Sequence, residues 1–178
     1  MSDQMFDDVG VLPRTPYKFG DWRRYAVHDE NNIKGFFGIH RWLSNFHPCE
    51  IEFEGMIFPS TENAYQAAKI IPEERTPLVT CTPYESKKVW KKYTKIDKSA
   101  EEWDARKYSG MVYLSLEKYN MNIELRNKLL ATGNKYLEET NHWGDSYWGV
   151  DIHRGGENIL GKVLMNVRTF WAQRPIHL

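Results

Sequence analysis

Apolar and polar side chains alternate along residues 49–58, CEIEFEGMIF, and the Glu54-Gly55 pair at the centre suits a two-residue turn. A period of two places successive side chains on opposite faces of a strand. This segment therefore predicts a β-hairpin. Residues 33–40, IKGFFGIH, and 135–140, KYLEET, are two further candidate strands.

The stretch 60–69, STENAYQAAK, has the pattern of a helix start. Ser60 or Thr61 is suited to capping, and Glu62 falls in the first turn, where the helix dipole favours a carboxylate. A helix over 62–71 then has one apolar face, made of Ala64, Ala67, Ala68 and Ile71. The opposite face carries Glu62, Tyr65, Gln66 and Lys69. Periodicity alone favours exposure of that polar face to solvent.

Four more helices are expected. The segment TPYE (82–85) has the residues of a capping box, with proline in the first turn, and predicts a helix to about Tyr93. SAEE (99–102) is a second capping box and predicts a helix to about Tyr119. Asn122 begins a short helix that ends at Gly133, and a C-terminal helix begins near Glu157.

These elements predict an α+β fold that is mostly helical with a small β-sheet. The chain has 178 residues, which is enough to bury one core. We expect residues 33–178 to form a single compact domain. Residues 1–32 have no sustained period, and we expect them to be an N-terminal extension that wraps the domain.

Composition narrows the class of protein. The 24 Lys and Arg balance the 24 Asp and Glu, and this lack of a basic excess is not typical of a protein that coats nucleic acid. A local pocket for one modified nucleotide stays compatible with it. No apolar run is long enough for a membrane span, and MSDQMFDDVG lacks the regions of a signal peptide. Two cysteines, Cys49 and Cys81, favour a reducing compartment, so we expect a cytoplasmic protein. Separately, we expect the protein to be a monomer.

The sequence lacks the motifs of several common metal, nucleotide and hydrolase sites. The six histidines have no zinc-like spacing with the cysteines, so no metal site is expected. The sequence has no P-loop, no dinucleotide fingerprint and no G-x-S-x-G elbow, and we expect no cofactor. Cys49 and Cys81 are interpreted as buried small hydrophobic residues rather than nucleophiles.

The loop 141–156, NHWGDSYWGVDIHRGG, is a second candidate for function. Two Trp-Gly pairs flank Asp145, which favours equally a loop that packs its own aromatic rings and one that stacks on a ligand. The following RGGEN (154–158) places backbone N–H groups at a helix start, where phosphate binds, although the glycines alone explain a turn. RWLSN (41–45) likewise suits either a capped turn or contacts to phosphate and ribose hydroxyls.

Three ordered blocks of the sequence resemble the NADAR family, also called YbiA-like. They are RWLSNFHPCEIEFEGMIFPSTENAYQAAK, EEWDARKYSGMVYLSLEKY and LLATGNKYLEETNHWGDSYWGVDIHRGGENILGKVLMNVR. The resemblance covers about residues 36–170 and not the N-terminal segment. Asn63 stands where the family usually has histidine, and Tyr119 where phenylalanine is commoner. Any role of that imidazole is therefore absent from this chain, or the family does not need it.

The resemblance implies an N-glycosidase that hydrolyses a C1–N bond between ribose and an amine-bearing base. One associated substrate class is ADP-ribose attached to guanine in nucleic acid, and the other is the ribosylaminopyrimidine phosphates of riboflavin synthesis. The family's functional residues carried to this sequence are Glu62, Trp103, Asp145 and Trp148, and Lys69 belongs to the same helix motif. The residues of these blocks are more similar to family members that consist of this domain alone. This similarity favours ADP-ribosylguanine as the substrate.

Two mechanisms stay open at the level of sequence. Glu62 or Asp145 can protonate the leaving nitrogen and activate water. Alternatively, an uncharged Lys69 can displace the base as an imine, which requires a lowered pKa that a nearby Glu62 would oppose. The expected substrate-binding residues are Arg41, Trp42, Ser44, Asn45, Phe46, Tyr65, Trp103, Trp148, Gly149 and Asn158.

Two other classes of function compete with an enzyme. A binding module for ADP-ribose or a nucleotide would bind product-like ligands without turnover. A structural protein would show no ligand effect on its melting temperature. The Glu–Lys helix face together with the Trp-Asp-Trp loop is more than a binding module needs, and so favours the enzyme.

Overall fold

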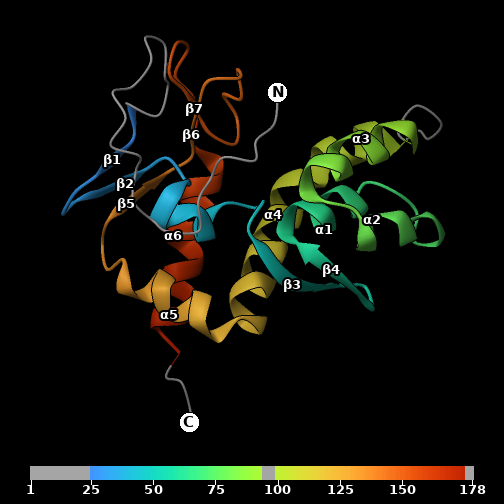
Figure 1. The fold of residues 1–178 in the computed structure, drawn as a ribbon, viewed down its shortest axis with the longest axis horizontal. Coiled ribbons are helices and arrows are strands. Elements are labelled where there is room, and N and C mark those ends of the chain that lie inside the picture. Colours follow the sequence, from blue (N-terminus) through green and yellow to red (C-terminus); the bar gives the residue numbers. More distant parts are fainter. Residues whose placement is uncertain (1–24, 94–98, 175–178) are drawn as a thin grey trace. The chain divides into compact units, whose positions relative to one another are not determined.

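The computed structural model describes residues 25–93 and 99–174 (Figure 1). Within it the chain divides into two compact units. The first contains the described residues up to Ser44 together with Thr132–Met165, and the second contains Asn45–Ala131 and the residues from Asn166 onward. Residues 1–24 of the predicted N-terminal extension lie outside the described part.

The second unit begins with the predicted hairpin. Strands β3 (Pro48–Phe53) and β4 (Met56–Ser60) pair antiparallel. Glu54 and Gly55 both have positive φ, 48° and 80°, as a two-residue hairpin turn of the expected class requires. The hairpin prediction is therefore confirmed.

Helix α1 (Thr61–Ala67) follows β4 directly. Oγ of Ser60 accepts a hydrogen bond from N of Asn63, which confirms the predicted cap. The helix ends four residues before the predicted end at Ile71. Pro72 excludes Ile71 from the helix, because the residue before a proline is driven from helical to extended backbone, and Ile71 has ψ 147°.

The sequence predicted four of the remaining helices in the described part of the chain with close agreement: α3 (Pro83–Tyr93), α4 (Ser99–Met121), α5 (Ile123–Ala131) and α6 (Ile159–Ala172). It did not predict the two short helices η3 (Pro72–Glu74) and α2 (Thr76–Thr80). Thr82 and Glu85 form the predicted capping box of α3, because each side chain accepts a hydrogen bond from the backbone N–H of the other. Gly133 follows α5 with φ 57°, as expected of a helix-ending glycine.

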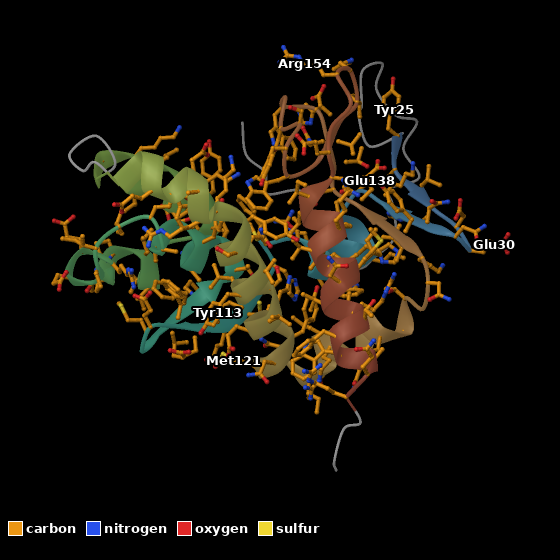
Figure 2. All side chains as sticks on the ribbon, turned by 180° about the vertical axis from the view of Figure 1, so that it is seen from behind. Tyr25, Glu30, Tyr113, Met121, Glu138 and Arg154 are labelled. Carbon is orange, nitrogen blue, oxygen red and sulfur yellow. The ribbon has the colours of Figure 1, made fainter. Side chains whose placement is uncertain are left out.

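In the second unit α1 packs against β3, α3 and α4. On α4, the thioether of Met121 accepts a hydrogen bond from N of Glu52 at 3.0 Å, and the ring of Tyr113 meets Phe53 edge-on at 6.1 Å (Figure 2). These contacts fix the long helix against the hairpin. The fully buried side chains around α1 include Ile51, Phe58, Leu78 and Leu114.

The first unit contains two small sheets. Strand β2 (Asn32–Lys34) pairs antiparallel with β1 (Val27–His28) and parallel with β5 (Tyr136–Glu138). Strands β6 (Thr140–Asn141) and β7 (Val150–Asp151) form a parallel pair. The described elements therefore confirm an α+β fold, mostly helical with small β-sheets.

The strand predicted over 33–40 is wrong beyond Lys34. Gly35 has φ 88°, which ends the strand, and the ring of Phe37 folds back so closely that a Cβ on Gly35 would lie 2.4 Å from it. Residues Gly38–Leu43 form the 3₁₀ helix η2 instead. In the described part of the chain, no helix is long and apolar enough to cross a membrane.

Candidate functional site

Both faces of helix α1 are buried. Its polar face includes Glu62, Tyr65 and Gln66, with exposed fractions of 6%, 6% and 3%. The preference from periodicity for a solvated polar face is therefore wrong, because α3 and α4 cover this helix. Ile71, which was assigned to the apolar face, is 47% exposed because the helix ends before it. Carboxylate and amide groups held at this depth are unusual unless they are bonded.

Three polar side chains of α1 and the turn after it form a hydrogen-bonded chain. Nε2 of Gln66 donates to Oε1 of Glu62 at 2.6 Å. Nζ of Lys69 donates to Oε1 of Gln66 at 2.8 Å. Helical spacing of three and four residues brings these groups together. Gln66 therefore links the predicted carboxylate to the predicted amine, and sequence reasoning had not placed it among the site residues.

Two aromatic rings accompany this chain. The rings of Tyr65 and Trp103 meet edge-on, with centroids 5.0 Å apart. Nζ of Lys69 lies 4.7 Å from the centroid of Tyr65 and 5.7 Å from that of Trp103. On α4, a Cβ at Gly110 would lie 3.3 Å from the Trp103 ring, so the glycine accommodates it. The structure thus brings the predicted Glu62, Tyr65, Lys69 and Trp103 together.

The surroundings of Lys69 lower its pKa from 10.5 to about 8. Burial of the amine is the main cause, because it disfavours the charged form. Glu62 acts in the opposite direction, while the positive charges of Lys87 and Lys91 lower the pKa further. Burial therefore outweighs the carboxylate, and about a tenth of Lys69 is uncharged at pH 7, far more than for an ordinary lysine.

Asn45 and Phe46 lie at the start of α1. The carbonyl of Asn45 accepts a hydrogen bond from N of Glu62 at 2.9 Å. Nζ of Lys87, on α3, lies 4.6 Å from the centroid of Phe46 and 3.9 Å from Oε1 of Glu62. Lys87 is therefore a second basic group beside the carboxylate. Nothing in the sequence distinguishes Lys87 from the other lysines of its helix.

Asn63, at the position where the resembling family usually has histidine, has a structural role. It is fully buried, and its Nδ2 donates to the carbonyls of Leu78 and Cys81 at 2.9 and 2.8 Å. Its Oδ1 accepts from Oγ of Ser60 at 2.5 Å. This side chain ties α1 to Leu78 within α2 and to Cys81, the residue that follows α2. The histidine-to-asparagine change therefore removes nothing from the Glu62–Lys69 chain of this protein.

The remaining predicted residues belong to the first unit. Arg41 and Trp42 are in η2, and Ser44 ends it by donating its N–H to the carbonyl of Arg41. This is the capped turn that the sequence offered as one alternative. Oδ1 of Asp145 accepts a hydrogen bond from N of Trp148 at 2.9 Å, and the ring of Trp148 packs edge-on against Tyr147 at 4.9 Å.

Asp151 organises the loop that holds Asp145 and Trp148, and sequence reasoning missed it. Its carboxylate accepts hydrogen bonds from the backbone N–H groups of Gly144, His153 and Arg154. Burial alone would raise its pKa, but these hydrogen bonds outweigh burial and hold the pKa below its usual range. Arg154 lies at the tip of this loop (Figure 2). The signal was present, because Asp followed by a Gly-rich turn favours such local hydrogen bonds.

The start of α6 is closed by the chain itself. The N–H groups of residues 157–160 donate to carbonyls of residues 146–149. The suggested phosphate site at RGGEN is therefore occupied by protein carbonyls. Glycine is required there for close packing, since a Cβ at Gly149 would lie 2.3 Å from the carbonyl of Glu139, and one at Gly156 would lie 2.1 Å from the carbonyl of Gly149.

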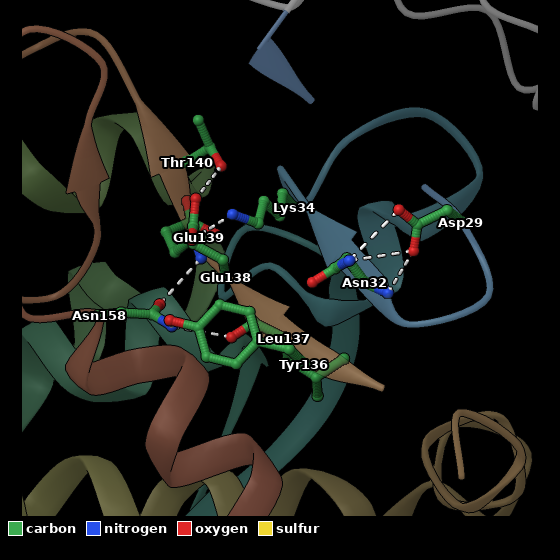
Figure 3. A network of polar contacts seen from close by, with 9 residues as sticks. All are labelled: Asp29, Asn32, Lys34, Tyr136, Leu137, Glu138, Glu139, Thr140 and Asn158. Atoms are coloured by element: carbon green, nitrogen blue, oxygen red, sulfur yellow. Dashed lines mark hydrogen bonds and ion pairs between the residues drawn. The ribbon is translucent and has the colours of Figure 1, made fainter. Parts of the chain in front are cut away.

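The side chain of Asn158 is also hydrogen-bonded to other protein groups (Figure 3). Its Nδ2 donates to the carbonyl of Leu137 at 2.8 Å and to the hydroxyl of Tyr136 at 3.0 Å. Its Oδ1 accepts from N of Glu139 at 3.1 Å. The residue is 1% exposed, and its backbone has φ 54°. These contacts give Asn158 a role in joining α6 to β5. Among the described residues, no group of His, Cys, Asp and Glu is arranged to hold a metal ion.

Comparison with known proteins places these features in context. A family model described as the NADAR domain matches residues 35–170. An N-glycosidase of Nostoc punctiforme is 32% identical over 131 residues, which are 71% of this chain and 82% of that protein. The N-glycosidase YbiA of Escherichia coli is 30% identical over 129 residues, which are 71% and 78% of the two chains.

The NMR structure of Escherichia coli YbiA has a TM-score of 0.68 at 26% identity, and the match covers 88% of this chain and 97% of that one. A riboflavin biosynthesis protein of Vibrio vulnificus is 32% identical over 131 residues, or 72% of this chain. This chain spans only 35% of the length of that Vibrio protein.

Proposed function

Because the chain belongs to the NADAR domain family, we propose that it is an N-glycosidase that hydrolyses the C1–N bond between a ribose and an amine-bearing base. The preferred substrate is ADP-ribose attached to guanine in nucleic acid. The proposal is supported by relatives in two bacteria that are named N-glycosidases. Its proposed catalytic groups in the second unit are Glu62 and Lys69, and Asp145, in the first unit, stays a catalytic residue predicted from the sequence.

The observation that carries the proposal is the hydrogen-bonded chain from Glu62 through Gln66 to Lys69. It combines a buried carboxylate with a buried amine whose pKa is about 8. A structural helix face has no need of an amine held partly uncharged, whereas nucleophilic catalysis requires one. The neighbouring rings of Tyr65 and Trp103 offer flat surfaces for a base or sugar.

A lysine route follows from this arrangement. The ribose ring opens, so that C1 and the base nitrogen form a protonated imine, and the lone pair of Lys69 Nζ adds to C1. A proton then moves from Nζ to the base nitrogen, the C1–N bond to the base breaks, and the base leaves as a free amine. Water adds to the remaining sugar–lysine imine, the C1–Nζ bond breaks, and the sugar leaves with an aldehyde at C1.

The carboxylates would move the protons in this sequence. Glu62 is the carboxylate linked to Lys69 through Gln66, and a carboxylic acid that gives its proton to the ring oxygen or leaving nitrogen becomes the base that activates water. Asp145, in the first unit, has the same chemistry available and stays a prediction from the sequence. If no adduct forms on Lys69, Glu62 carries the alternative acid–base route.

A second substrate class is supported by one comparison. The Vibrio relative is named for riboflavin biosynthesis, which favours a ribosylaminopyrimidine phosphate as the alternative substrate. Both classes present the same bond, a ribose C1 joined to a nitrogen on a base. They differ in what lies beyond it: a nucleic-acid strand and a diphosphate in one, and a single 5-phosphate in the other.

The test is a mass-spectrometric release assay with both substrates. The purified protein is incubated with an oligonucleotide that carries ADP-ribosylguanine and, separately, with a ribosylaminopyrimidine phosphate. Free ADP-ribose from the first supports the preferred substrate, and ribose 5-phosphate from the second alone supports the alternative. Release from neither, with a ligand-dependent rise in melting temperature, would replace the enzyme by a binding module.

Two variants sharpen this assay. Glu62→Gln is expected to abolish release while keeping the shape of a buried side chain, so its melting temperature should stay close to that of the parent. Glu124→Gln is the matched control, because Glu124 is also a first-turn glutamate but is exposed on α5. A full rate in Glu62→Gln would remove Glu62 from the mechanism.

A further inference from the structure

Helix α3 presents a dense basic face. Lys87, Lys88, Lys91 and Lys92 are all exposed on this one helix of 11 residues. At about 100° per residue the four lysines spread over roughly 140° of the helix surface, and Tyr84 projects from within the same sector. Tyr84 is 58% exposed, and Nζ of Lys88 lies 4.4 Å from the centroid of its ring. The face therefore combines cations with an exposed aromatic ring.

This basic face adjoins the candidate catalytic helix. Helix α3 packs beside α1 within the second unit (Figure 1). Lys87 reaches Oε1 of Glu62 at 3.9 Å, and the charges of Lys87 and Lys91 act on the amine of Lys69. One edge of the lysine sector thus meets the candidate catalytic groups. The other edge carries Lys88 and Lys92, which lie roughly 100° and 140° around the helix axis from Lys87.

Little on α3 itself offsets this charge. Glu85 is the one acidic residue in the sequence of the helix, and its carboxylate is engaged by N and Oγ1 of Thr82 in the capping box. The whole chain has balanced charges, 24 basic and 24 acidic residues. Four lysines on one helix are therefore a local concentration that the overall composition concealed.

The dimensions of the face fit a chain of phosphates rather than a single phosphate. Lys87 and Lys91 are separated by about 6 Å along the helix axis. A nucleic-acid strand carries one phosphate per nucleotide, so cations spread over this length reach more than one phosphate. Exposed aromatic rings among cations are the usual means of holding single-stranded nucleic acid, because bases stack on the rings.

We propose that the Tyr84–Lys92 face of α3 binds the single-stranded nucleic acid that flanks the modified base. The proposal rests on the proposed glycosidase function and selects a strand, rather than a free nucleotide, as its substrate. Lys87 and Lys91 would hold the phosphates nearest the scissile bond. Lys88, Lys92 and Tyr84 would hold the next nucleotides.

The first test measures binding without catalysis. The probe is an unmodified, fluorescein-labelled 12-nucleotide single strand, titrated by fluorescence anisotropy at several salt concentrations. The variant Lys88→Glu/Lys92→Glu should bind at least tenfold more weakly, and the slope of log K against log salt should fall by about 1.4 or more, because each lost phosphate contact removes about 0.7. Tyr84→Ala should weaken binding severalfold with the slope unchanged.

The control variant is Lys128→Glu/Lys162→Glu, which makes the same change in net charge at exposed positions on α5 and α6. It should bind like the parent. Equal weakening in both double variants would overturn the proposal, because the effect would then follow net charge and not the α3 face. Absence of binding by the parent protein would overturn it as well.

The second test separates this surface from the chemistry. The parent and the α3 variant are compared on an ADP-ribosylguanine oligonucleotide and on free ADP-ribosylguanosine. The variant should lose about tenfold in kcat/KM on the oligonucleotide and nothing on the nucleoside. Equal rates on the oligonucleotide would overturn the docking surface. Failure of the parent to release ADP-ribose from either would instead contradict the proposed function, while the anisotropy result still decides the surface.

Discussion

Nζ of Lys69 donates a hydrogen bond to Oε1 of Gln66 over 2.8 Å, and the nitrogen of that same amide is bonded to Glu62. Gln66 therefore stands as a neutral group between a carboxylate and an amine. A direct ion pair would favour the charged lysine, whereas an amide accepts its hydrogen bond without adding negative charge. This arrangement explains how burial can lower the pKa of Lys69 to about 8 on the same helix face as a glutamate.

The lowered pKa predicts the pH dependence of covalent trapping. Borohydride added during turnover should reduce the sugar–lysine imine to a stable adduct on Lys69. Only the uncharged amine reacts, so the rate of adduct formation should rise nearly tenfold per pH unit below about pH 7 and level off above about pH 9, around the pKa of about 8. Peptide mass spectrometry measures the adduct. A rate still rising at pH 10 would indicate an ordinary lysine, and no adduct at any pH would leave the acid–base route.

Replacing the neutral Gln66 by a charged residue should shift the pH dependence of covalent trapping on Lys69. Gln66→Glu places a second carboxylate at hydrogen-bonding distance from Nζ of Lys69, which favours the ammonium and raises its pKa. We expect the trapping profile to move up by at least about one pH unit, since even a partly screened ion pair is worth ~1.4 kcal/mol at this depth. The pKa of Lys69 can also be followed without substrate, by the pH dependence of its reductive methylation.

Gln66→Leu is the matched control for this shift. It removes the same hydrogen bonds without adding charge, so the profile should not move to higher pH. An upward shift of similar size in both variants would show that the hydrogen bond of Gln66, and not its neutrality, sets the pKa of Lys69.

Local patterns in the sequence predicted the local structure well. The hairpin turn at Glu54-Gly55, the cap at Ser60 and the capping box of α3 each depend on residues within four positions, and each is confirmed. The predicted end of α1 was wrong, although Pro72 contained the information needed to correct it.

The periodicity of the sequence does not show which elements cover the candidate site. The pattern established that Glu62 and Lys69 share a face, but the helices that cover this face, α3 and α4, come later in the chain. Burial and the lowered pKa of Lys69 follow from that covering. Similarly, RGGEN and Asn158 have the composition of a phosphate site, and only the positions of the partner carbonyls assign them to packing.

Asn158 should therefore affect stability and not substrate binding. Asn158→Ala removes three hydrogen bonds and leaves buried backbone groups unpaired, and it puts alanine at φ 54°, a left-handed conformation that asparagine tolerates better than alanine. We expect a loss of about 3 kcal/mol in the free energy of unfolding, measured by urea denaturation. Asn158→Gly should lose about 1 kcal/mol less, because glycine adopts positive φ without strain. A KM raised in the folded fraction of both variants would instead give Asn158 a place in the binding site.

Lys69 itself should reduce stability at neutral pH. Lowering its pKa from 10.5 to about 8 corresponds to roughly 3 kcal/mol against the charged form in the folded protein. The unfolded chain holds more protons than the folded one between these two pH values, so stability from this group rises as pH increases from 8 to 10.5, and the penalty is fully present below pH 8. Lys69→Met removes the penalty and also the hydrogen bond to Gln66, worth about 1 kcal/mol.

Lys69→Met should consequently be inactive in trapping and yet more stable than the parent by about 1–2 kcal/mol at pH 7, a rise of roughly 3–6 °C in Tm. The difference should shrink toward zero or reverse as the pH approaches 10, where the parent lysine is largely uncharged in the folded state. Thermal denaturation of both proteins across pH 6–10 measures it. Lys128→Met, at an exposed lysine of α5, is the control and should change Tm little at any pH. A variant less stable than the parent throughout this range would mean that burial does not lower the pKa of Lys69 in the folded protein, which would remove the uncharged nucleophile on which the lysine route depends.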